Sequence, residues 1–236
     1  MTPSRLNTAT RILGILTLIA MAVSLYMALI WSPPERTMLG DTVRILYFHA
    51  PAAWTAYLSF GVVAIASIMY LWKRKHIWDV IALASAEIGV LLTTLTLISG
   101  MLWGKTVWGT YWTWDARLTS TLVLWLIYVG YLMLRAAIDD PERRARLAAI
   151  VGIVGALDIP LIHFAVLWWR TLHPQPIAIR PGGPALDPPL ALTLNVAMIA
   201  FTLLYAYLLL ARIQLELARD RAEAMRQPIE VPVGAD

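Results

Sequence analysis

The sequence predicts an all-α integral membrane protein, built as a bundle of six transmembrane helices with both termini in the cytoplasm. Composition is the first reason. Hydrophobic residues make up 59% of the 236 residues and charged residues only 14%, and the mean hydropathy is +0.67. Soluble domains have about 45–50% apolar and about 25% charged residues. The chain lacks the polar residues to cover a soluble surface, so its excess apolar surface must face lipid.

The second reason is a set of apolar stretches long enough to cross a bilayer. A hydrocarbon core about 30 Å thick requires about 20 apolar residues of helix. The first stretch runs directly into Ser32-Pro33-Pro34 without a small-residue cleavage motif, so it is interpreted as a retained span and not a signal peptide. The last is expected to continue as helix through Arg226, before Pro228 and Pro232 end it. In chain order the predicted spans are 12–31, 50–72, 78–103, 118–136, 147–169 and 189–211.

The distribution of basic residues is the third reason, and it sets the orientation. Thirteen of the 19 Lys and Arg fall on the side of the termini, and cytoplasmic segments are the ones enriched in these residues. The formal charge of +4 therefore reflects membrane topology, and no nucleic-acid partner is expected. No soluble domain or fixed repeat interrupts the spans, so residues 1–236 are predicted to be one polytopic membrane domain with a cytoplasmic tail at 212–236. The absence of Cys excludes disulfides, thiolate metal sites and thioether-linked cofactors.

A Trp-rich segment, residues 103–117, occupies the middle outer loop. Trp and Tyr prefer the depth of the lipid headgroups, so an aromatic belt is one interpretation. A belt usually contributes one or two aromatics per helix end, whereas this loop carries five, and a ligand platform is favoured. A short surface helix would place Trp108 and Trp112 on one face, and Gly104 and Gly109 would let the backbone approach a flat ligand. The aromatic residues of the segment are Trp103, Trp108, Tyr111, Trp112 and Trp114.

Two histidines, His49 and His173, are expected to flank this segment at one depth, at the outer ends of spans two and five. Neutral imidazole is a good metal ligand. His163, inside span five, and His76, in an inner loop, are interpreted as structural, hydrogen-bonded residues. Two imidazoles, an aromatic shelf and nearby cations suit haem, which offers a flat face, an iron that needs axial ligands and two propionates. The nearby cations are Arg44, Lys105, Arg117 and Arg170.

Several charged residues allow more than one interpretation. Asp115 is expected to cap the N-terminus of span four, and it could also orient Arg117 or an indole N–H. Contact with lipid phosphate is an equal alternative for Arg170 and Arg180. Glu87 and Asp158 lie near mid-membrane, where ionised carboxylates are costly. They are expected to be protonated, paired across helices or turned toward a partner, roughly 15 Å below the haem site at about 1.5 Å rise per residue.

The sequence also resembles a known family. Trp108-Gly-Thr-Tyr-Trp112-Thr-Trp114-Asp115 looks like the WGxxWxWD signature of the haem-handling membrane proteins. Within that group the chain resembles the CcmC family of the cytochrome c maturation system, and the similarity extends from about residue 40 to 175. It includes Tyr47-Phe48-His49-Ala50-Pro51 and the segment from Ile159 to His173. The resemblance implies a haem site at the periplasmic side of the bacterial inner membrane, and a transfer subunit that is not an enzyme in its own right.

The resemblance further implies the cargo, the partners and the site residues. The cargo is haem b, held non-covalently with two histidines on the iron. The partners are an ABC transporter (CcmA ATPase and CcmB membrane subunit), the single-span subunit CcmD and the periplasmic haem chaperone CcmE. His49 and His173 correspond to the axial ligands. The remaining haem-binding residues expected are Trp103, Trp108, Trp112, Trp114, Asp115, Arg44 and Arg117.

Two other function classes remain open from sequence. A membrane cytochrome b for electron transfer also uses paired histidines, but its ligands face each other across a helical bundle inside the membrane, and only His163 is expected there. A permease or assembly subunit without its own haem would use the Trp-rich segment for protein docking. Glu87 and Asp158 support that second alternative weakly, because intramembrane carboxylates often mark ion paths.

Overall fold

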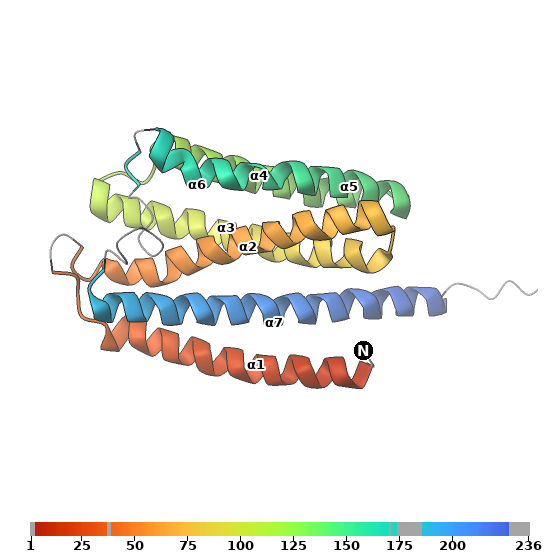
Figure 1. Cartoon of the computed structure of the whole chain (residues 1–236), viewed down its shortest axis with the longest axis horizontal. Coiled ribbons are helices and arrows are strands. Elements are labelled where there is room, and N and C mark those ends of the chain that lie inside the picture. Colours follow the sequence, from red (N-terminus) through yellow and green to blue (C-terminus); the bar gives the residue numbers. More distant parts are fainter. Residues whose placement is uncertain (1–2, 37–38, 170, 174–185, 227–236) are drawn as a thin grey trace, which may run out of the picture.

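A computed structural model describes residues 3–36, 39–169, 171–173 and 186–226, and within these ranges almost all regular structure is helical. The exception is an isolated bridge between Glu35 and Gly40. The helices lie side by side along one axis (Figure 1). In chain order the helical elements are α1 (Pro3–Tyr26), the π-helix η1 (Met27–Trp31), α2 (Val43–Lys73), α3 (His76–Trp108), α4 (Ala116–Ala137), α5 (Pro141–Ala156), α6 (Asp158–Trp168) and α7 (Pro188–Arg226).

The predicted fold class and number of spans are confirmed. Within the described ranges, six helical segments are long and apolar enough to cross a membrane, with α5 and α6 together forming the fifth. The start of α1 and the end of α7 lie at the same end of the bundle, which we call the terminal end (Figure 1). The segment 109–115 lies at the opposite end, which we call the loop end. The predicted extension of the last helix through Arg226 is also confirmed.

Three differences between the helices and the predicted spans bear on the site. The second begins at Val43 and runs through Pro51, so His49 belongs to a helix and not to a loop. The third continues to Trp108. The fifth is divided at Leu157, three residues before Pro160. Proline has no N–H to donate to the carbonyl four residues earlier, and that carbonyl belongs to Ala156, where α5 ends.

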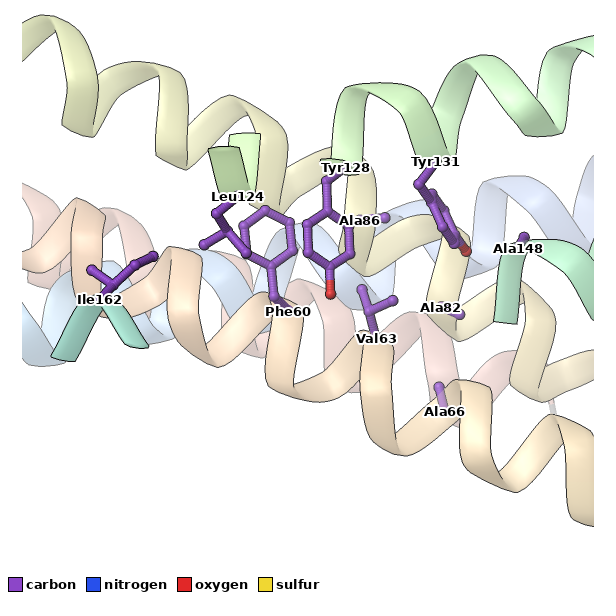
Figure 2. Close-up of a cluster of buried hydrophobic side chains, with 10 residues drawn as sticks. All are labelled: Phe60, Val63, Ala66, Ala82, Ala86, Leu124, Tyr128, Tyr131, Ala148 and Ile162. Atoms are coloured by element: carbon purple, nitrogen blue, oxygen red, sulfur yellow. The ribbon is translucent and has the colours of Figure 1, made fainter. Parts of the chain in front are cut away.

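The core is built around α2, which packs against α3, α5 and α7. Figure 2 shows its central cluster, where the ring of Phe60 stacks on that of Tyr128 with centroids 3.7 Å apart. The Tyr128 hydroxyl donates a hydrogen bond to the carbonyl of Gly152, 2.9 Å away. Glycine allows this approach of helices, since a Cβ at Gly152 would lie 2.9 Å from a side-chain atom of Val63. Close packing of this kind holds membrane helices together, because lipid is as apolar as the side chains.

Among the described residues, arginine side chains pair with carboxylates of other helices at two places. Arg135 binds Asp79 through two parallel bonds, the longer of 2.8 Å, and both side chains are buried. Arg212 on α7 binds Glu87 on α3 at 2.6 Å. Glu87 is therefore paired across helices, one of the three states expected from the sequence. Asp158 differs, because its buried Oδ2 has no hydrogen-bond partner among the described residues.

Candidate functional site

A cavity of about 550 Å³ opens among the helices toward the loop end. Its walls come from α2, α3, α4, α6 and α7, together with Trp112 of the loop and His173. Pockets that hold small molecules have volumes of about 300–1,000 Å³ and are mostly apolar, with a few placed polar groups. Among the described lining residues, the polar and aromatic groups include three imidazoles, four indoles, one phenol and one guanidinium. They belong to His49, His163, His173, Trp54, Trp103, Trp108, Trp112, Tyr57 and Arg117.

His49 is held in the second turn of α2 by contacts with α3. Its Nδ1 lies 3.2 Å from the carbonyl oxygen of Thr96 and 3.1 Å from the hydroxyl oxygen of Ser99. A carbonyl only accepts hydrogen bonds, so the bond to Thr96 requires the proton on Nδ1. In that neutral tautomer Nε2 carries the lone pair. This is the arrangement by which a backbone carbonyl orients a metal-binding histidine.

His173 is brought next to His49 from a position 124 residues along the chain. The centres of the two rings are 6.3 Å apart and their planes differ by 34°. Two imidazole nitrogens about 2 Å from one metal, on opposite sides of it, place the ring centres about 6 Å apart. The observed separation therefore leaves room for one metal between the two rings.

Indole rings surround the pair of imidazoles. Trp103 lies nearly parallel to His49 at 6.4 Å, and Trp108 lies edge-on to Trp103 at 5.6 Å and to His173 at 6.4 Å. Trp103 and Trp108 are on the last turns of α3, and Trp112 adds a third ring from the loop. The Nε1 atoms of Trp103 and Trp112 are buried and have no acceptor among the described residues. A buried N–H donor without a partner is costly, so both groups would gain from an acceptor supplied by a ligand.

The predicted surface helix carrying Trp108 and Trp112 is not present. Helix α3 ends at Trp108 because Gly109 adopts a left-handed conformation, with φ of 76°, and residues 110–115 are irregular. Gly104 also acts differently from the prediction, since an added Cβ there would lie 3.2 Å from the Thr110 carbonyl oxygen. Its small size makes room for the loop and not for a ligand. The spacing of Trp108 and Trp112 in the sequence is the same whether or not the chain turns between them. It therefore could not indicate that the helix ends at Trp108.

Of the predicted cations that the structure describes, Arg117 lies at the cavity, whereas Arg44 and Lys105 bind elsewhere. Arg117, in the first turn of α4, lines the cavity and is close enough to act electrostatically on His49 and Tyr57. Arg44 donates to the Ala28 carbonyl at 2.7 Å and to Asp41 at 3.1 Å. It stabilises the end of η1 and is not part of the cavity wall. Lys105 donates to the Gly109 carbonyl at 3.1 Å, and Arg170 and Arg180 lie outside the described residues.

Asp115 and Trp114 lie beside the cavity. Asp115 caps α4, as predicted, by accepting bonds of 3.0 Å from the backbone N–H groups of Arg117 and Leu118. It thereby fixes the turn from which Arg117 projects. Trp114 is 76% exposed, packs edge-on against Trp112 and does not line the cavity.

Comparison with known proteins places the sequence in a family. Residues 4–228 match CcmC, described as heme exporter protein C. The chain belongs to the CcmC family. A heme exporter protein C of Bradyrhizobium diazoefficiens is 44% identical over 210 residues, covering 89% of this chain and 79% of that protein. Those of Haemophilus influenzae and Escherichia coli K12 are 36% and 38% identical, covering 88% and 83% of this chain and 84% and 80% of theirs.

In this CcmC-family chain the cavity extends farther inward than the sequence suggested. Ile159, Pro160 and His163 of α6 line it, and Asp158 acts electrostatically on the lining residue Tyr57. Asp158 itself is not one of the described lining residues, and its depth below the site stays a prediction. The sequence indicated a site at the outer face, whereas the cavity wall also runs inward along α6. Sequence reasoning also missed Tyr57 and Trp54, since neither stands out among the apolar residues of the second span.

Proposed function

We propose that this protein binds haem in the cavity and presents it for covalent loading onto a periplasmic haem chaperone during c-type cytochrome biogenesis. The proposal rests on one observation above all. Two imidazoles at a separation suited to one metal share a mostly apolar cavity with several indoles and one guanidinium. A flat apolar macrocycle with a metal at its centre and carboxylates at its edge matches that combination. The names of the relatives, heme exporter protein C, point in the same direction.

In this proposal each group of residues has one task. His49 and His173 hold the iron from its two axial sides, with His49 oriented by Thr96 and Ser99. Trp103, Trp108 and Trp112 seat the ring by stacking and by edge contacts. Arg117 neutralises a propionate, and a charge-assisted bond of that kind is stronger than a neutral one.

The Nε1 groups of Trp103 and Trp112 would donate to the same ligand and so lose their unpaired state. Haem supplies the vinyl group to which the chaperone becomes joined, while this protein supplies position and charge. It therefore acts as a binding and transfer subunit and not as an enzyme in its own right.

The membrane placement follows from the basic residues. We place the terminal end in the cytoplasm and the loop end, with the cavity, on the periplasmic side of the inner membrane. The partners in this scheme are the ABC transporter subunits CcmA and CcmB, the small subunit CcmD and the chaperone CcmE. Haem then leaves the cavity at the face where the chaperone is found.

Haem binding by the purified protein tests the proposal. The protein in detergent is mixed with haem, and the visible absorption spectrum and bound haem are measured for the wild type, His49→Ala and His173→Ala. We expect the wild type to show a six-coordinate spectrum, and each variant to show an altered spectrum and weaker binding.

His76→Ala is the matched control, because His76 is the first residue of α3, binds Asp220 and does not line the cavity. It should match the wild type. Colourless wild-type protein in the presence of haem would refute the proposal and favour a permease or assembly role. Unchanged spectra in both cavity variants would refute the assignment of the ligands.

A further inference from the structure

His163 is a third imidazole on the wall of the cavity that contains His49 and His173. It lies on α6, five residues before the end of that helix at Trp168, whereas His173 follows the helix. The neighbouring lining residues Ile159 and Pro160 are still farther from the loop end. Along α6 the cavity wall therefore runs inward from the level of His173, which is paired with His49, past His163. We call the part of the cavity beside His163 and Pro160 its inner region.

The surroundings of His163 do not explain its presence as a structural residue. Its ring meets Phe164 edge-on at 5.2 Å, and its nitrogens form no hydrogen bond with any described residue. His49 and His76 differ from His163, since His49 bonds to Thr96 and His76 to Asp220. A polar side chain without a partner inside a membrane span is costly and marks a functional position by default.

Part of the wall at this level is accessible. His163 and Pro160 are exposed, Phe164 is 39% exposed, and all three line the cavity. They belong to α6, which is part of a membrane-spanning segment. A ligand inside the cavity can therefore reach the imidazole of His163.

We infer that His163 is a second, inner iron-binding position, where an iron porphyrin is held before His49 and His173 bind it. This inference rests on the proposed function, since it concerns the same cavity and ligand. A neutral imidazole nitrogen with no other bond is available to one axial side of the iron. The same cavity would then hold the iron first beside α6 and afterwards between His49 and His173.

The test removes the outer ligands and asks whether haem is still held. The full-length His49→Ala/His173→Ala variant in detergent is titrated with haem, and the spectrum and dissociation constant are measured. We expect it to retain haem with a spectrum different from the wild type. Adding His163→Ala should weaken the remaining binding by about tenfold or more, equivalent to about 1.4 kcal/mol. Adding His163→Met instead should keep binding and shift the spectrum, because thioether sulfur also ligates haem iron.

Two controls separate iron binding from misfolding. His76→Ala, added to the double variant, removes a histidine outside the cavity and should change nothing. Iron-free protoporphyrin should bind the double and triple variants equally, because it needs no axial ligand. Size-exclusion profiles in detergent should match for all variants.

The outcomes distinguish the two ideas. Haem binding that is identical in the double and triple variants, or already lost in the double variant, would overturn the inner position while leaving the outer pair intact. A double variant with the wild-type spectrum would instead contradict the proposed outer ligands. Wild-type protein that binds no haem would overturn both.

Discussion

Replacing Gly100 by Ala should weaken haem binding without destabilising the fold. Gly100, on α3, faces the imidazole of His49, and a Cβ there would lie 3.0 Å from the ring carbon Cε1. An ordinary contact is at least 3.4 Å, so the ring must move by about 0.4 Å or more. The bonds from Nδ1 to Thr96 and Ser99 resist that movement. A movement of that size is comparable with the roughly 0.5 Å within which the groups of a binding site have to be held.

The expected size of the effect follows from how metal sites respond to changes around their ligands. Mutation of groups that orient a metal-binding histidine typically costs about 10–100-fold in affinity, and we expect about tenfold for Gly100→Ala. Stability should be unchanged or slightly raised, because Ala is favoured over Gly inside helices by about 1 kcal/mol. Haem titration gives the affinity, and thermal unfolding in detergent gives the stability.

Gly61→Ala is the matched control for this experiment. Gly61 lies on the same helix as His49, and an added Cβ there has no atom within 4 Å. It should bind haem like the wild type. Equal haem affinity and equal spectra for Gly100→Ala and Gly61→Ala would refute the reasoning, because the position of the His49 ring would then not matter for binding.

Three further predictions concern the scaffold. Asp79→Asn should lower the unfolding free energy by about 3–5 kcal/mol, because Arg135 is left as an unpaired buried charge; replacing both residues by Leu should recover most of the loss, and an unchanged melting temperature in Asp79→Asn would contradict this. Gly89→Ala should cost about 1–3 kcal/mol by overpacking, since its Cβ would lie 2.5 Å from the ring of Phe60; stability equal to the wild type would show that the ring moves freely. Asp115→Ala should cost about 0.5–2 kcal/mol and speed amide hydrogen exchange at the start of α4, whereas Asp115→Asn should keep the cap; equal exchange in both variants would count against the capping role.

The helical class and the number of spans could be predicted because hydropathy is a local property of the chain. Each span satisfies its own backbone hydrogen bonds, so no knowledge of neighbouring helices was needed. The approach of His49 to His173 could be expected from depth alone, once the spans were counted. The cap by Asp115 follows equally from local chemistry, because the carboxylate and the N–H groups it accepts from are adjacent in sequence.

The features that could not be predicted depend on partners distant in the chain. Glu87 binds Arg212 across 125 residues, and no local pattern identifies that partner. Arg44 resembles a ligand-binding cation in sequence, yet the π-helix η1 presents a carbonyl that it binds instead. The depth of the cavity depends on how α6 stands against α4 after the break at Leu157, and that angle is set by packing.

The last helix connects the two ends of the molecule without interruption. Helix α7 has 39 residues and is about 58 Å long at about 1.5 Å per residue, nearly twice the thickness of a hydrocarbon core of about 30 Å. Leu194 and Met198 form part of the cavity wall near its start, and Asp220 binds His76 near its end. Because no loop interrupts α7, a tilt imposed on one end of this helix also moves its other end. A protein that binds the terminal end of α7 would therefore be able to move the wall of the cavity at the other side of the bilayer.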